Sequence, residues 1–221
     1  MGNWFHDELD ALNTHLLEMG SMIEYAIETG VQAMEQRNAE LARTIVSYDR
    51  EIDQKEREIE SQCLKLLLRQ HPVARDLRLI SAALKMITDM ERIGDQSADI
   101  AEIVTHLAGR PYITDLSALK RMSEAACGMV ARSVDAFVQR DLALAEAVVR
   151  DDDIVDAQFC AVRATLVELI RKDGANGEQA LDLLMVAKYL ERIGDHAVNI
   201  AEWVIYSITG VHKNEELEKP I

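Results

Sequence analysis

Two segments of this chain carry acidic side chains at the same spacing. The sequence ERIGDQSADIAEIV begins at Glu91, and the closely similar ERIGDHAVNIAEWV begins at Glu191. Because a helix turns by about 100° per residue, acids at every fourth position share one face and repel one another by a few tenths of a kcal/mol per pair. A chain that builds this repulsion twice is expected to bind cations there, since carboxylate oxygens are the ligands of hard metal ions.

A second pair of acids precedes each segment. Aligning the two halves of the sequence places Asp49 and Asp53 at positions equivalent to Asp152 and Asp156. Consecutive helices with short connections run antiparallel, so these pairs can face the ERIGD acids. Carboxylates from two helices suit Mg²⁺, Mn²⁺, Ca²⁺ or iron rather than copper, and zinc is kept among the candidates. The predicted metal ligands are therefore Asp49, Asp53, Glu91, Asp95 and Asp99 in the first half, and Asp152, Asp156, Glu191, Asp195 and Asn199 in the second.

The two candidate sites are not identical. Asn199 stands where the first half has Asp99, which predicts that the second site is less charged and binds metal more weakly. A charged stripe on a single helix is usually a solvated face, and Arg92 or Arg192 could neutralise the neighbouring acids. The repetition on both helices of both halves favours a metal-capable surface over that interpretation. His196 has no histidine counterpart in the first half and is predicted to be incidental.

Gly94 and Gly194 lie inside these acidic segments, where a glycine costs about 1 kcal/mol relative to alanine in a helix. That cost is consistent with a close approach of another helix or a ligand, and equally with a tolerated kink.

The elements that carry the acids are predicted to be long helices. Apolar residues recur at helical spacing, which predicts an all-α fold with helices over about 3–36, 39–70, 73–107, 116–139, 142–173 and 178–210. Asn38 and Asp141 are the predicted N-caps of the second and fifth helices, and His71-Pro72 and the GANG sequence at 174–177 are the predicted breaks. We expect two tandem antiparallel three-helix bundles, at residues 1–109 and 115–210, followed by a polar tail at 211–221. Six helices around one core is the alternative.

Composition limits the kinds of partner. The chain has 24 Lys and Arg against 39 Asp and Glu, a net charge of −15, which argues against nucleic acid or an anionic membrane and makes a poor surface for a free anion such as phosphate. Cys63, Cys127 and Cys160 form no metal-type or disulfide pattern. A secretion signal and an apolar run of about 20 residues are both absent from the sequence, which favours a soluble, cytoplasmic protein.

Several of these residues resemble one known family. The duplicated ERIGD segments, the acid pairs on the preceding helices, and the sequence PVARDLR from Pro72 to Arg78 are similar to the PhoU family of phosphate-transport regulators. This resemblance covers nearly the whole chain. It implies two similar three-helix bundles with multinuclear metal sites on their acidic faces. The PVARDLR sequence has no match in the second half, where GANGEQALD stands, so a partner contact made by that segment is expected once.

The resemblance also implies a function. Such a protein would restrain phosphate uptake by coupling the ATPase of a phosphate ABC transporter to a membrane sensor histidine kinase. Two alternatives stay open: a metal-free helical scaffold whose acidic faces bind basic partners, and a carboxylate di-metal enzyme. The enzyme is disfavoured, because such enzymes usually carry Glu-x-x-His on two helices and none of the six histidines has Glu three residues earlier. A homodimer is plausible, since long apolar stripes leave surface to cover.

Overall fold

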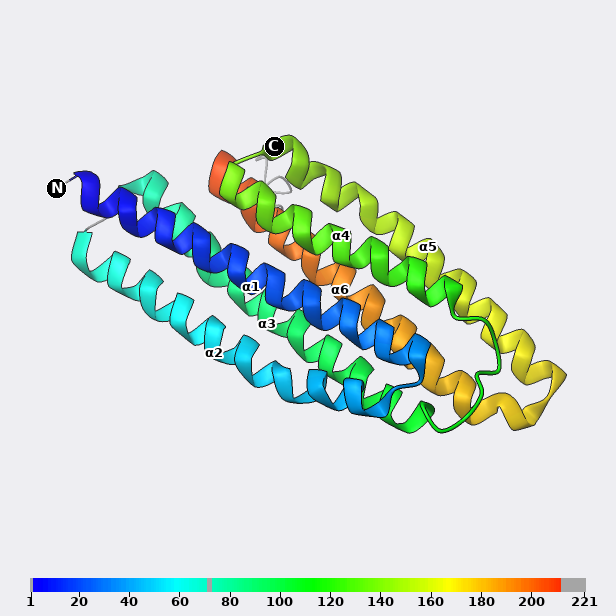
Figure 1. Cartoon of the computed structure of the whole chain (residues 1–221). Helices are drawn as coiled ribbons and strands as arrows, with labels where there is room; N and C mark the ends of the chain where they lie inside the picture. The colour runs from blue at the N-terminus through cyan, green and yellow to red at the C-terminus, as the bar shows by residue number, and fades with distance from the viewer. Residues whose placement is uncertain (1, 71–72, 212–221) are drawn as a thin grey trace, which may run out of the picture.

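Between residues 2 and 211, apart from 71 and 72, the chain forms six long helices and one short one (Figure 1). The computed structural model describes residues 2–70 and 73–211, with side chains for 7–68 and 73–211. The first half contains α1 (Gly2–Gln36), α2 (Ala39–Gln70) and α3 (Ala74–Leu107). The second contains α4 (Ser117–Gln139), α5 (Leu142–Lys172), the 3-10 helix η1 (Gly174–Asn176) and α6 (Gly177–Thr209). The predicted break at His71-Pro72 and the tail from residue 212 lie outside the described residues.

Equivalent local signals end and begin the helices of the two halves. The side chains of Asn38 and Asp141 accept hydrogen bonds from the backbone N–H groups of Leu41 and Leu144, at 3.1 and 3.0 Å, which confirms both predicted N-caps. The residues that follow the preceding helices, Arg37 and Arg140, adopt left-handed φ angles of 51° and 56°. The left-handed residue turns the chain back so that the last carbonyls find backbone donors. Each hairpin therefore has the same entry and exit geometry.

The connection before α6 lies at the predicted GANG break. Helix α5 ends at Lys172, Gly174–Asn176 forms a 3-10 turn, and α6 begins at Gly177. The Asp173 carboxylate accepts a hydrogen bond from the Ala175 N–H at 2.9 Å, and Asn176 donates to the Leu169 carbonyl at 3.1 Å. These bonds satisfy backbone groups left over at the end of α5 and lead the chain directly into α6.

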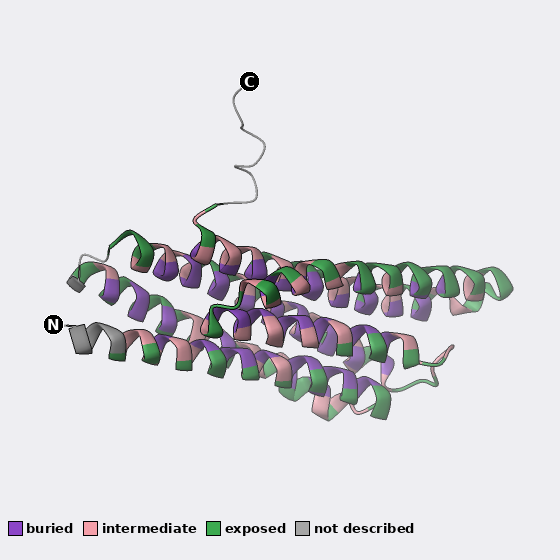
Figure 2. Cartoon of the chain, turned by 90° about the horizontal axis from the view of Figure 1, so that it is seen from above, coloured by how far each residue is buried: buried purple, intermediate pink, exposed green. Residues whose placement is uncertain are grey.

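The predicted all-α fold of two three-helix bundles is confirmed, and the bundles share a continuous hydrophobic core. Figure 1 shows the helices side by side in an elongated array, in which α3 of the first half lies against α6 of the second. Helix α3 packs against α1 and α2 of its own half and against α6 of the other, while α1 also contacts α4. Buried residues line the inner faces and exposed residues the outer faces (Figure 2). The interface between α3 and α6 therefore joins the two halves.

No helix among residues 2–70 and 73–211 is long and apolar enough to cross a lipid bilayer. The three cysteines are free thiols, with Cys63 and Cys127 buried and Cys160 exposed. Burial raises the pKa of the Cys63 and Cys127 thiols to about 12. Both therefore stay protonated and behave as core residues.

Gly94 allows the close packing of α3 on α2. A methyl group added at Gly94 would lie 3.0 Å from Ile52 Cγ2 and 3.2 Å from Ile52 Cδ1, and Ile52 is only 1 % exposed. This confirms the expected close helix approach. We expect Gly94→Ala to lower the free energy of unfolding by about 1–2 kcal/mol, because overpacking costs about 1–3 kcal/mol and the gain in helix propensity only partly offsets it. Thermal unfolding in a chelator measures this change.

The matched control is Gly194→Ala. Its added methyl would lie 3.2 Å from Asp152 Oδ1 and 3.5 Å from Val155 Cγ1, a less crowded environment with a polar neighbour at its edge. A smaller loss of stability is expected for this variant. A Gly94→Ala protein that melts at or above the wild-type temperature would show that Ile52 has room to move and would contradict the prediction.

Candidate metal centre

The first acidic face lies between α2 and α3. Asp49 Oδ1 is hidden from solvent and has no hydrogen-bond partner, and it lies 3.5 Å from the position of a Cβ added at Gly94. Burial raises the pKa of Asp49 from 3.8 to about 6, with further contributions from the negative charges of Asp95, Asp53 and Asp99. The predicted acids of α2 and α3 are thus close enough to repel one another across the helix pair.

The second acidic face, between α5 and α6, repeats this arrangement. Asp152 Oδ1 is hidden and unpartnered, and it lies 3.2 Å from a Cβ position on Gly194. The pKa of Asp152 is raised from 3.8 to about 6 by burial and then by Asp156, Asp195, Glu191 and Asp153. Two hidden, unpartnered carboxylate oxygens at equivalent positions are costly features that a bound cation would compensate.

The surrounding acids respond in the same direction. Burial, followed by repulsion from Asp95, raises the pKa of Glu91. Burial and then Glu191 raise that of Asp195. In both centres, therefore, negative charge is concentrated beyond what the available cationic side chains neutralise. This is the electrostatic environment in which a divalent ion binds in place of protons.

Basic side chains contact several of the predicted ligands. Arg92 Nη1 lies 3.0 Å from Asp95 Oδ2, and Arg92 Nε lies 3.5 Å from Glu91 Oε2. Arg57 approaches Asp53 at 3.4 Å, and Lys188 forms an ion pair with Glu191. Within the described part of the chain, no three His, Cys, Asp or Glu side chains are arranged closely enough to hold an ion as they stand. Ion pairs with exposed basic partners, such as Arg92–Asp95, contribute little individually to stability.

The fifth position of each acidic face points toward the other half. Burial and then the charges of Glu102 and Asp95 raise the pKa of Asp99, whereas Tyr189 and Arg192 of α6 act to lower it. In the second half, Asn199 Nδ2 donates to Asp89 Oδ1 of α3 at 3.0 Å. Asn199 is thus engaged with the first half, whereas Asp99 also contributes to the negative charge felt by Asp49.

His196, predicted to be incidental to the acidic face, contacts Asp89 of the other half. His196 Nδ1 lies 2.8 Å from Asp89 Oδ1, and the two side chains are 17 % and 16 % exposed. With Asn199, they form a polar cluster across the α3–α6 interface. Asp89, His196 and Tyr189 are functional-site neighbours that the sequence pattern did not single out. The sequence does show that the two halves differ at these positions, because Asp89 aligns with Tyr189 and Gln96 aligns with His196.

The donor types match those of a hard metal ion, although the side chains of the described residues are not placed closely enough to hold one as they stand. Each half presents aspartate and glutamate oxygens from two helices, and each contains a hidden oxygen without a donor. The glycine on the facing helix leaves open the space beside that oxygen, which a methyl group would partly fill. Oxygen-rich sites of this kind suit Mg²⁺, Mn²⁺, Ca²⁺ and iron.

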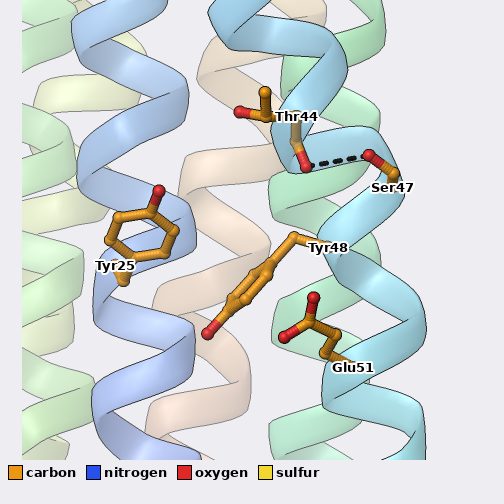
Figure 3. Close-up of a pocket in the computed structure, with 5 residues that line it drawn as sticks. All are labelled: Tyr25, Thr44, Ser47, Tyr48 and Glu51. Carbon is orange, nitrogen blue, oxygen red and sulfur yellow. Dashed lines mark hydrogen bonds between the residues drawn. The ribbon is translucent and has the colours of Figure 1, made fainter.

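A separate hollow lies on the outside of the first half, between α1 and α2. Figure 3 shows its lining residues, Tyr25, Thr44, Ser47, Tyr48 and Glu51. The rings of Tyr25 and Tyr48 meet edge to face, with centroids 5.2 Å apart and an interplanar angle of 72°. This geometry is favourable for aromatic pairs and fastens α1 to α2. We interpret the pair as a packing contact rather than as part of the acidic centre.

The fold and the two acidic faces define a class of duplicated helical proteins with one carboxylate cluster in each half. The family model described as the PhoU domain matches this chain twice, over residues 16–104 and 119–204. This chain belongs to the PhoU family.

Named relatives and solved structures agree. The chain is 37% identical to the phosphate-specific transport system accessory protein PhoU homolog of Clostridium acetobutylicum, over 93% of this chain and 94% of that protein. It is 34% identical to the corresponding homolog of a Burkholderia species, over 95% and 91%. The crystal structure of PhoU from Pseudomonas aeruginosa superposes with a TM-score of 0.89 at 34% identity, covering 94% of this chain and all of that one. PhoU from Streptococcus pneumoniae, titled a phosphate transport system regulatory protein, gives 0.86 at 26% identity, over 94% and 98%.

Proposed function

We propose that this chain is a metal-binding regulatory adaptor that restrains phosphate uptake. Its relatives are named accessory proteins of the phosphate-specific transport system, and a structural neighbour is titled a regulatory protein. The observation that carries the metal-binding part is the hidden, unpartnered oxygen of Asp49 and its repeat at Asp152. We place the protein in the cytoplasm, between the ATPase of the phosphate ABC transporter and a sensor histidine kinase, as a negative regulator of both uptake and phosphate-starvation signalling.

A bound ion would supply positive charge that offsets the repulsion within each acidic face. In the first half, Asp49 and Asp53 would hold it from α2, and Glu91, Asp95 and Asp99 from α3. In the second half, Asp152 and Asp156 would act with Glu191 and Asp195. Arg92 and Lys188, which now contact these acids, would be released toward solvent. Metal loading would therefore change the charge of both outer faces, and a protein partner that binds there would respond to that change.

A non-enzymatic role is favoured over a carboxylate di-metal enzyme. The relatives are named as accessory and regulatory proteins. His196, which follows Asp195 in the sequence, contacts Asp89 at the helix interface, with Nδ1 2.8 Å from Oδ1. A metal-free scaffold is the remaining alternative, and elemental analysis separates it from the proposal. We expect Mn²⁺, Mg²⁺ or iron to co-purify with protein prepared without a nickel column.

The adaptor role is tested by binding to its partners. Purified transporter ATPase and the cytoplasmic part of the sensor kinase are immobilised, and the chain is passed over each with Mn²⁺ or with a chelator. We expect binding to both partners, with affinities that change several-fold between the two conditions. Light scattering on the same samples establishes whether the chain is a homodimer. Equal affinity with and without metal would separate the acidic centres from partner recognition and contradict this part of the proposal.

A further inference from the structure

The groove between α1 and α2 differs in chemistry from its counterpart between α4 and α5. In the first half it is the hollow of Figure 3, about 550 Å³ in volume, in which the rings of Tyr25 and Tyr48 meet edge to face. The alignment of the two halves places Gly128 and Asp151 at the positions of these two tyrosines. The same alignment pairs the two left-handed residues that follow α1 and α4. The two grooves therefore lie at equivalent places in the fold, and only the first is aromatic.

In the second half an arginine of the chain itself occupies this place. Arg132 on α4 donates from Nε to the Gly128 carbonyl at 3.0 Å and from Nη1 to Asp151 Oδ2 on α5 at 2.6 Å. Its guanidinium group therefore bridges the two helices and contacts both residues that stand in place of the tyrosines. The equivalent of Arg132 in the first half is Thr29, which is uncharged and only 6 % exposed. The first half thus has the groove without an equivalent guanidinium group.

The side chains of the first hollow suit a guanidinium group that comes from another protein. The lining residues supply two aromatic rings, two hydroxyl groups, one carboxylate and no basic side chain: Tyr25, Thr44, Ser47, Tyr48 and Glu51. Tyr25 is 50 % exposed, so its ring is accessible from solvent. Figure 3 shows Glu51 on the turn of α2 next to Tyr48, and its negative charge contributes, after burial, to the raised pKa of Tyr48. A carboxylate beside aromatic rings binds a planar cation through an ion pair and a cation–π contact.

We propose that the hollow between α1 and α2 binds the guanidinium group of an arginine side chain on a partner protein, against the rings of Tyr25 and Tyr48 and paired with Glu51. The second half shows how such a group is held at the equivalent place, by one carboxylate and one carbonyl. The net charge of −15 attracts a basic partner surface, and arginine is enriched at the centres of protein interfaces. The inference rests on the adaptor role proposed above but not on its metal-binding part.

The test is an NMR titration of isotope-labelled protein with the capped tripeptide acetyl-Ala-Arg-Ala-amide, which carries one guanidinium group and no other charge. We expect saturable shift changes at the backbone amides around Tyr25 and Tyr48. Glu51→Gln and Tyr25→Leu should each weaken binding about three- to fivefold, because each removes one exposed ion pair or cation–π contact. Tyr25→Phe keeps the ring and should bind as the wild type does. Because Tyr25 also packs on Tyr48, Glu51→Gln at an exposed position is the decisive variant.

Two controls separate a specific site from general attraction to an acidic protein. The same peptide with citrulline, the uncharged isostere of arginine, should not bind. Asp153→Asn on α5 removes one charge from an exposed position outside the hollow and should leave the affinity unchanged. Shift changes spread over both halves, or equal binding by Glu51→Gln and the wild type, would overturn the inference. Peptide binding in the hollow by a chain that binds neither the transporter ATPase nor the sensor kinase would support the site and contradict the proposed partners.

Discussion

Replacing Asp49 and Asp152 together by asparagine should abolish metal binding by this chain. Asparagine keeps the size of the side chain and one oxygen, but it removes the charge from the hidden atom at the middle of each acidic face. A pair of unit charges 4 Å apart interacts by about 4 kcal/mol at an effective dielectric constant of 20, so the affinity of each centre should fall by at least ~100-fold. Calorimetric titration of metal-stripped protein with Mn²⁺ measures the loss.

Single variants and charge-matched controls sharpen this result. Asp49→Asn should remove one class of sites and Asp152→Asn the other. Glu51→Gln on α2 and Asp153→Asn on α5 remove the same charge from exposed positions near each centre and should change affinity by less than about threefold, as expected for solvent-screened charges. Binding that survives in the double variant would place the ions elsewhere and refute the assignment of these two aspartates.

The metal-free protein should lose stability as the pH rises through the range 4 to 7. The pKa values of Asp49 and Asp152 are about 6 in the folded protein and 3.8 as the reference, so the folded state binds these protons more tightly than the unfolded state does. The stabilising contribution is full below about pH 4 and is lost as the pH passes the folded value. Because both groups are partly solvated, we expect a loss of about 2 kcal/mol for the two centres together, or about 4–8 °C in melting temperature.

The double asparagine variant provides the reference for this measurement. Burial also raises the pKa of other acids, including Glu24 and Glu56. Such contributions are shared by wild type and variant, so the difference between the two pH profiles isolates the two aspartates. Saturating Mn²⁺ should restore the wild-type stability near neutral pH. Parallel profiles for wild type and variant would mean that neither aspartate is desolvated in solution.

The sequence was sufficient to predict the helices and the faces on which the acids lie. Asn38 and Asp141 cap their helices as expected, because an N-cap is decided by residues only three positions apart. The hidden positions of Asp49 and Asp152 follow from helical periodicity and from the antiparallel pairing of consecutive helices. These rules use residues close in sequence, and the alignment of the two halves then gave the equivalent acids of the second half. The ions themselves stay a prediction.

The contacts between the halves could not be predicted in this way. The bonds from Asp89 to His196 and Asn199 join residues more than a hundred positions apart, and their partners depend on how α3 rotates against α6. No periodic pattern encodes that rotation. His196 has no histidine counterpart in the first half, so the repeat pattern gave no reason to expect its contact with Asp89. Lys188 beside Glu191 was missed because nothing in the sequence pattern fixes how a long exposed side chain will turn.

The residues that face one another across α3 and α6 differ between the two halves, so the halves are not equivalent. A protein assembled from two first halves would set Asp89 against Asp99 at both crossings, so two pairs of carboxylates would lie close together, with Gln96 in place of His196 beside them. Two second halves would instead bring Tyr189 to Asn199, which can still form a hydrogen bond. The two halves are consequently expected not to be interchangeable, and replacement of the first repeat by a copy of the second should cost less stability than the reverse.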